Sequence, residues 1–127
     1  MARILVVDDD RELLEVLGEW LGYRGHVVRL VDDGLRAVQE ARSFAPDVVL
    51  LDAVLCGTTG PAVAEVLRDG GFGSIVYLTG LPTSTLPADA PVLEKPIDLE
   101  RLERTIQRLV DRRATDQLRT EAASQAR

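Results

Sequence analysis

The 127-residue sequence has one cysteine, few aromatic residues and no long apolar run. The single cysteine, Cys56, excludes an internal disulfide and a cysteine-based metal cluster, and it agrees with a reducing compartment. No apolar run approaches the roughly 18 residues of a membrane-spanning helix. MARILVVDDD reaches acidic residues too early for the core of a signal peptide. We therefore expect a cytoplasmic protein.

The sequence also lacks an excess of basic residues. Fifteen lysines and arginines stand against 21 acidic residues, which gives a net charge of −6. Nucleic-acid binding needs a concentrated basic face, and the sequence shows none. We therefore expect proteins or cations as partners, and neither nucleic acid nor membrane. The length suits one domain with a buried core and is too short for two.

Short apolar segments alternate five times with longer amphipathic segments, which indicates an α/β fold with a parallel sheet and helices on both faces. We expect strands at residues 3–8, 26–31, 47–52, 74–79 and 92–95. Helices are expected between them, at about residues 11–22, 35–45 and 61–69. Asp9 or Asp10 would cap the first helix. The segment DVVLLD is apolar without alternation, so we expect it at the centre of the sheet.

The segment before the fifth strand interrupts this alternation. Residues 80–91, GLPTSTLPADAP, hold three prolines and no sustained helical pattern, so we expect at most one short turn there. From Asp98 onward, apolar residues at helical spacing predict a last helix. We assign residues 1–112 to the domain and residues 113–127 to a polar tail or an extension of that helix.

Chemically active side chains stand at the ends of the predicted strands, which is where ligands bind in such sheets. Asp8 and Asp9 end the first strand, Asp52 the third, Thr79 the fourth and Lys95 the fifth. Three acids, a hydroxyl and an amine would therefore meet in one cleft.

Neighbouring carboxylates need a counter-charge, because two of them about 4 Å apart repel by about 4 kcal/mol at an effective dielectric of about 20. Mg²⁺ suits this set of side chains, since it takes oxygen ligands from carboxylates and completes its shell with water and phosphate oxygens. Lys95 is a poor metal ligand but a good phosphate contact. The pattern predicts a magnesium-assisted phosphoryl-transfer site.

Four segments, ILVVDDD, DVVLLD, IVYLTG and VLEKP, occur in the order and at about the spacing of receiver domains of two-component response regulators. The chain resembles that family from residue 3 to about residue 110. The resemblance implies a flavodoxin-like three-layer sandwich with a five-stranded parallel sheet of order 2-1-3-4-5, the fourth helix being short or absent. It also implies a phosphoacceptor in a phosphorelay. The donor would be a histidine kinase or a histidine phosphotransfer protein, and the domain would switch conformation or act as a phosphate sink.

The resemblance also implies residue roles. Asp52 looks like the phosphoacceptor, Thr79 like the switch hydroxyl and Lys95 like the phosphate contact. The Mg²⁺ ligands would be Asp8, Asp9, Asp52 and the main-chain carbonyl of Val54. The choice of Asp52 as acceptor rests on the resemblance alone. The Lys95–Pro96 bond would be cis, and the domain would catalyse its own aspartyl phosphorylation and dephosphorylation.

Three features depart from the family pattern. Val92 stands where similar domains usually carry a tyrosine or phenylalanine that reports the switch. The interval from Thr79 to Lys95 is several residues short, as in receivers of some hybrid kinases. Cys56 replaces a common proline. Val54 and Leu81 would flank the phosphoryl group with apolar side chains that cannot orient water, so we predict slow self-dephosphorylation.

Two other functions remain open from the sequence. A small magnesium-dependent phosphatase of the haloacid-dehalogenase type also opens with an apolar strand that runs into Asp-x-Asp, and Asp8 and Asp10 match that pattern. That family places an acid pair after the lysine, whereas only Asp98 precedes the last helix here. A degenerate receiver used as an interaction module is the second alternative.

Two further features have surface interpretations. Arginines interleaved with glutamates on the last helix form either a solvated surface or the edge of a dimer or partner face. These residues are Glu100, Arg101, Glu103, Arg104 and Arg108. His26 is expected near the surface, at the start of an outer strand and far from the site.

Overall fold

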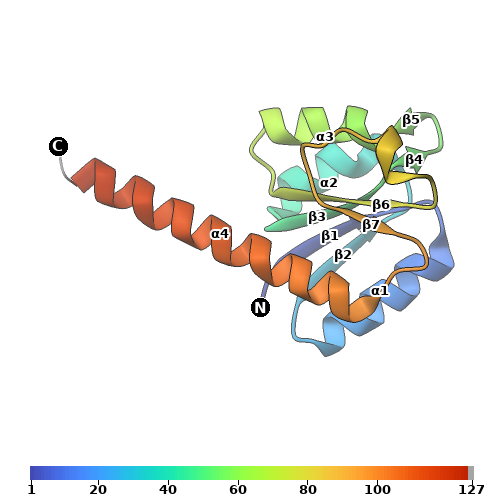
Figure 1. Ribbon diagram of the computed structural model, residues 1–127, viewed down its shortest axis with the longest axis horizontal. Coiled ribbons are helices and arrows are strands. Elements are labelled where there is room, and N and C mark those ends of the chain that lie inside the picture. The colour runs from blue at the N-terminus through green and yellow to red at the C-terminus, as the bar shows by residue number, and fades with distance from the viewer. Residues whose placement is uncertain (126–127) are drawn as a thin grey trace.

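Five short apolar segments form one parallel sheet in the order β2-β1-β3-β6-β7 (Figure 1). The strands are β1 (Arg3–Val7), β2 (Val27–Val31), β3 (Val48–Asp52), β6 (Ser74–Thr79) and β7 (Val92–Glu94). The structure is a computed structural model that describes residues 1–125. The central strand β3 is buried along its whole length, as its unbroken apolar run predicted. The predicted strand order is confirmed.

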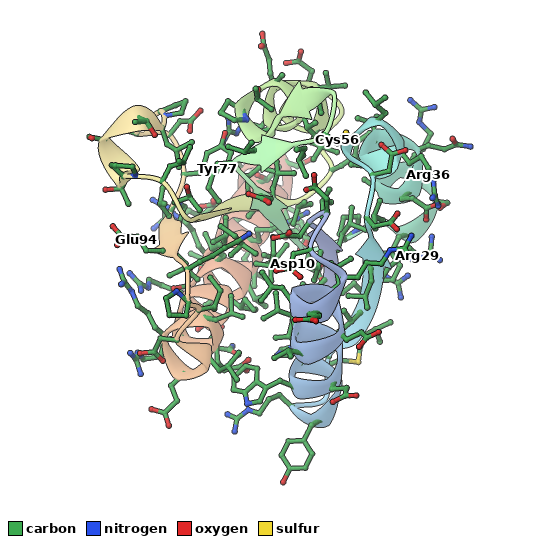
Figure 2. All side chains as sticks on the ribbon, turned by 90° about the vertical axis from the view of Figure 1, so that its right-hand side faces the viewer. Asp10, Arg29, Arg36, Cys56, Tyr77 and Glu94 are labelled. Carbon is green, nitrogen blue, oxygen red and sulfur yellow. The ribbon has the colours of Figure 1, made fainter. Side chains whose placement is uncertain are left out.

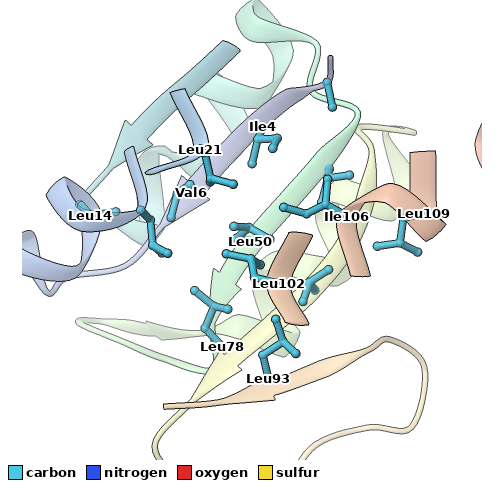
Figure 3. Packing of buried hydrophobic residues seen from close by; sticks show 14 residues of the cluster. Ile4, Val6, Leu14, Leu21, Leu50, Leu78, Leu93, Leu102, Ile106 and Leu109 are labelled. Atoms are coloured by element: carbon cyan, nitrogen blue, oxygen red, sulfur yellow. The ribbon is translucent and has the colours of Figure 1, made fainter. Parts of the chain in front are cut away.

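Helices cover both faces of the sheet. Helices α1 (Arg11–Tyr23) and α4 (Leu99–Gln125) pack on one face, and α2 (Ala37–Phe44) and α3 (Gly60–Asp69) on the other. Buried apolar side chains form two clusters, the first between the sheet and helices α1 and α4, the second between the sheet and helices α2 and α3. Side chains alternate along each strand, so Ile4 and Val6 lie in the first cluster while Leu5 and Val7 lie in the second. Figure 3 shows the first cluster, where leucines of α1 and α4 meet the sheet.

The helix starts follow local capping chemistry. The Asp10 side chain accepts hydrogen bonds from the backbone N–H groups of Glu12 and Leu13, so Asp10 is the cap of α1. The Thr59 side chain caps α3 in the same way, with Pro61 in the first turn. The second helical segment begins with a 3-10 turn, η1 (Gly34–Arg36).

The segment between β6 and β7 contains one short 3-10 turn, η2 (Thr83–Thr85), as the prolines predicted. Residues 54–59, which lie outside the expected strands, form a small hairpin of β4 (Val54–Leu55) and β5 (Thr58–Thr59). The hairpin lies close against Gly34 of η1. A Cβ atom added at Gly34 would lie only 2.8 Å from the side chain of Leu55 and 2.9 Å from that of Thr58. The hairpin therefore packs on η1.

Helix α4 continues without a break to Gln125, and its second half projects away from the sheet (Figure 1). The last two residues of the predicted tail, 126–127, lie outside the described part of the chain. Arg113 ties the helix to the domain where it leaves, because its Nη1 donates to the carbonyl of Asp47 at 2.8 Å. Within residues 1–125, no helix is long and apolar enough to cross a membrane.

His26 is buried, and the expectation that it lies near the surface is wrong. Its Nδ1 accepts a hydrogen bond from the Ala2 N–H at 3.0 Å, and its Nε2 lies 3.0 Å from Oε1 of Glu103. The sequence did not reveal this position because α4, far along the chain, covers the start of β2. His26 therefore links β2, the N-terminal segment and α4.

Candidate functional site

Four neighbouring strands bring the predicted site residues to one edge of the sheet. Asp8 and Asp9 follow β1, and Asp52 and Thr79 end β3 and β6. Lys95 follows β7, and the Lys95–Pro96 bond is cis as expected. Figure 2 looks onto this end of the molecule, where Asp10 and Cys56 are labelled.

Three carboxylates form the centre of the site. Asp8, Asp9 and Asp52 each offer an oxygen, and these oxygens lie within 4.8 Å of one another. Asp8 is fully buried, and its Oδ1 accepts a hydrogen bond from the backbone N–H of Asp10 at 2.8 Å. Asp9 is exposed and accepts from the backbone N–H of Cys56 at 3.0 Å. Asp9 thus ties the end of β1 to the hairpin after β3.

Lys95 supplies the positive charge of the site and is the sole lysine of the sequence. Its Nζ lies 2.8 Å from Oδ2 of Asp8 and 3.3 Å from Oδ2 of Asp52. Burial acts to lower the pKa of Lys95, but the two carboxylates outweigh it and raise the pKa above its usual value of 10.5. Lys95 therefore stays charged.

The Asp52 side chain is held from two sides. Its Oδ1 accepts from the backbone N–H of Val54 at 3.1 Å, and its Oδ2 faces Lys95. Burial is the largest influence and raises the pKa of Asp52, and the negative charge of Asp8 raises it further. The hydrogen bond from the Val54 N–H and the positive charge of Lys95 act in the opposite direction and lower it. The net pKa lies above the usual value of 3.8, because burial disfavours the charged form.

Thr79 is buried at the end of β6. Its Oγ1 accepts from the backbone N–H of Leu81 at 2.9 Å, and its carbonyl accepts from the backbone N–H of Lys95 at 2.7 Å. Within residues 1–125 its hydroxyl forms no hydrogen bond with Asp52. Thr79 thus connects the backbone at Lys95 to the loop that leaves β6.

Gly60 is a positioning residue that the sequence analysis did not single out. A Cβ atom at this position would lie 2.4 Å from the carbonyl oxygen of Asp52 and 2.9 Å from Cα of Ala53. Its backbone N–H donates to the Ala53 carbonyl at 2.9 Å. A glycine directly before Pro61 at a helix start was the available signal. Only the three-dimensional structure shows that the backbone of Asp52 lies close to this glycine.

The residues singled out beside the family pattern differ in where they lie. Val54 and Leu81 are 55% and 48% exposed, two residues beyond Asp52 and Thr79 respectively. Val92 is half-buried and pairs in register with Tyr77. Cys56 is exposed.

The donor set fits Mg²⁺. All three clustered side chains are carboxylates, which are the hard oxygen ligands that Mg²⁺ takes. One of them, Asp8, is fully buried, and the single ammonium group of Lys95 pairs with two of the three acids, Asp8 and Asp52. The cluster therefore keeps an excess of negative charge that a divalent cation would neutralise.

Comparisons with known proteins identify relatives of the chain. A family model described as response regulator receiver domain matches residues 4–107. The DNA-binding response regulator MtrA of Mycobacterium tuberculosis is 44% identical over 77 residues, which are 61% of this chain and 34% of that protein. The response regulator MprA of a Mycobacterium species is 35% identical over 122 residues, which are 91% of this chain and 53% of that protein. The chain thus spans about a third to about half of the length of these relatives.

Solved structures give the same result for the fold. The response regulator protein TrrA of Thermotoga maritima, solved in complex with Mg²⁺-BeF, is 29% identical with a TM-score of 0.76. The match covers 86% of this chain and 99% of that chain. The receiver domain of the hybrid histidine kinase CckA is 26% identical with a TM-score of 0.74, covering 85% of this chain and 98% of that chain.

Proposed function

The chain belongs to the family of response regulator receiver domains, and we propose that it accepts a phosphoryl group on Asp52 in a magnesium-dependent reaction. The observation that carries this proposal is the meeting of Asp8, Asp9 and Asp52 with Lys95 at one edge of the sheet. A magnesium ion and a phosphoryl group together would satisfy this set of charges.

Asp52 is the proposed nucleophile because it ends the central buried strand and is held by the Val54 N–H and Lys95. In the transfer, a carboxylate oxygen of Asp52 bonds to phosphorus while the phosphorus–nitrogen bond of a donor phosphohistidine breaks. The donor nitrogen keeps the electron pair of that bond. Rigid placement favours such an in-line displacement.

Other residues would stabilise the transferred group. Lys95 places its ammonium beside Asp52 and would pair with a phosphoryl oxygen. We propose that the Thr79 hydroxyl leaves Leu81 to contact the phosphoryl group and so moves the loop after β6. Asp8, Asp9, Asp52 and the Val54 carbonyl would hold Mg²⁺, which when bound neutralises charge on phosphoryl oxygens.

The proposed donor is a histidine kinase or a histidine phosphotransfer protein. A groove of about 350 Å³ adjoins the site, and its lining includes Leu13, Val16, Pro96 and Ile97 beside Lys95. Val16 is 52% exposed. An apolar surface next to the reacting groups would dock the donor protein so that its phosphohistidine reaches Asp52.

The domain would catalyse its own phosphorylation and dephosphorylation, and act as a conformational switch or as a phosphate sink. We place this unit at residues 1–112, with the rest of α4 as an extension. We also propose a cytoplasmic location, with which the exposed free thiol of Cys56 agrees.

Intact-mass spectrometry after incubation with acetyl phosphate and Mg²⁺ tests the proposal. We expect one phosphoryl adduct in the wild type, its loss in Asp52→Asn, and its loss when Mg²⁺ is chelated. Asp69→Asn is the control, because Asp69 is an exposed acid at the far end of α3. An adduct that survives in Asp52→Asn but disappears in Asp8→Asn would favour the phosphatase alternative. Absence of both adduct and Mg²⁺ binding would favour the interaction-module alternative.

A further inference from the structure

A groove follows the outer edge of the sheet at β2, on the side that helix α1 covers. Strand β2 comes first in the order of the sheet, so one of its two edges carries no strand (Figure 1). Two pockets of about 350 and 380 Å³ lie between this strand and α1, and Glu15 and Leu30 line both of them. We call the two pockets together the β2 groove. None of the residues proposed for phosphoryl transfer belongs to its lining.

Main-chain groups of β2 are free at this edge. The Val27 N–H donates to the Ala2 carbonyl at 2.9 Å, so Val27 faces β1. The alternation of a parallel ladder then turns the N–H and carbonyl groups of Val28 and Leu30 away from β1. Within residues 1–125, no protein group forms a hydrogen bond with these four outward groups. The edge thus offers two donors and two acceptors.

The edge also lacks the features that usually protect an outer strand. The β2 sequence VVRLV contains neither proline nor lysine. Its one charged side chain, Arg29, turns to the other face of the sheet and pairs with Glu40 of α2 at 3.3 Å. Val27 and Leu30 are each 40% exposed. An open edge with exposed apolar side chains favours the pairing of an added strand.

Two acids determine the charge of the β2 groove. Glu15 and Glu19 lie one helical turn apart on α1 and are exposed, and in the described part of the chain, residues 1–125, neither forms a salt bridge. Arg11 and Arg36 line the same groove, but each pairs with an acid. The groove therefore carries two negative charges that no arginine neutralises.

A second copy of the chain fits this edge poorly. Antiparallel pairing that uses the outward groups of both Val28 and Leu30 would place Arg29 of one copy directly opposite Arg29 of the other. The same pairing would put both α1 helices on one face of the joined sheet. The unpaired glutamates of the two copies would then face a common groove and repel each other.

From the open edge and its two acids, we propose that the β2 groove binds an extended, lysine-rich segment of a partner protein as an added strand. The outward groups of Val28 and Leu30 pair with the backbone of that segment. Its lysines lie on the α1 side, where their ammonium groups meet Glu15 and Glu19. Apolar residues that alternate with the lysines contact Val27 on the other face. The groove contains no residue of the carboxylate site, so this binding does not depend on phosphoryl transfer.

Fluorescence anisotropy with a fluorescein-labelled peptide of alternating lysine and valine tests this proposal. The test variant combines Glu15→Gln with Glu19→Gln. The control combines Glu65→Gln with Asp69→Asn, which removes the same charge from two exposed acids at the same spacing on α3. We expect the test variant to weaken binding about fivefold or more, and the control to change it about twofold or less.

A second probe tests the main-chain pairing. The same peptide with a methylated backbone keeps its side chains and charge but loses its N–H donors, and we expect it to bind the wild type about tenfold or more weakly. Circular dichroism checks that each variant keeps the wild-type fold.

Three outcomes would overturn the proposal. Equal weakening by the test and control variants would mean that only overall charge matters. Unchanged binding of the methylated peptide would exclude an added strand. Self-association of the wild type in sedimentation, abolished by Leu30→Lys, would make a second copy of the chain the occupant.

Discussion

The ammonium nitrogen of Lys95 lies 2.8 Å from Oδ2 of Asp8, a carboxylate with no exposed surface. This contact joins the ends of β1 and β7, which are separated by two strands in the sheet. It places the sole lysine of the chain against its most buried acid. The pKa of this one amine therefore reports the balance of charge in the site.

The pKa of Lys95 should lie above that of an ordinary lysine. Its folded value is raised, so its contribution to stability is fully present below the usual 10.5 and is lost as the pH rises through the folded pKa. Reductive ¹³C-methylation gives one lysine signal, whose titration by NMR reports this pKa. Asp8→Asn should move the titration to lower pH. A wild-type signal that titrates like a free lysine would contradict the ion pair.

Asp52→Asn should stabilise the folded domain at neutral pH without Mg²⁺. The pKa of Asp52 is raised on folding, so the ionised side chain opposes folding at a pH above that value, and this cost disappears below the usual 3.8. Urea unfolding should therefore show a gain at neutral pH that shrinks in acid. Asp69→Asn, at an exposed position, should show no comparable gain. A loss of stability in Asp52→Asn at neutral pH would refute the argument.

Gly60→Ala should destabilise the domain by about 1–3 kcal/mol, because the added methyl group would press on the backbone of Asp52. The same substitution should weaken Mg²⁺ binding, since it displaces a proposed ligand. Gly22→Ala is the matched control. It lies in α1 with nothing within 4 Å of an added Cβ, and it should be neutral or stabilising. Equal effects of the two substitutions in urea unfolding would count against the close approach at Gly60.

His26→Ala should cost about 1–3 kcal/mol of stability, because it leaves the Ala2 N–H without an acceptor and removes a buried ring. Because Nδ1 accepts from Ala2, the proton sits on Nε2 and is donated to Glu103. Glu103→Gln keeps an oxygen acceptor there and should cost less. The comparison is made by urea unfolding, and a larger loss in Glu103→Gln would contradict this hydrogen-bond arrangement.

Dephosphorylation should be slow if Asp52 is phosphorylated as proposed. Val54 and Leu81 are exposed apolar residues beside the site and cannot orient an attacking water. Val54→Asn should speed the decay of the phosphorylated form about tenfold or more, measured by intact mass after removal of the donor. Val66→Asn, at an exposed position on α3, should leave the rate unchanged. Wild-type decay within seconds would contradict the idea.

Much of the fold was determined by local sequence. The apolar runs fixed five strands, and the prolines between residues 80 and 91 limited that segment to the short turn η2. The acids and the lysine at the ends of the strands also located the candidate site. These features depend on residue spacing and backbone chemistry, which the chain carries without reference to distant segments.

The tertiary structure decided what depends on packing between distant segments. The hairpin after β3 packs against η1, and Glu103 of α4 covers the buried His26. Gly60 is required because the start of α3 lies against the backbone of Asp52, which is a contact between two separate elements. The glutamates of α1 were visible in the sequence, but the groove they line required β2 beside them. Burial and contact between segments far apart in the chain arise from the fold, and no local pattern encodes them.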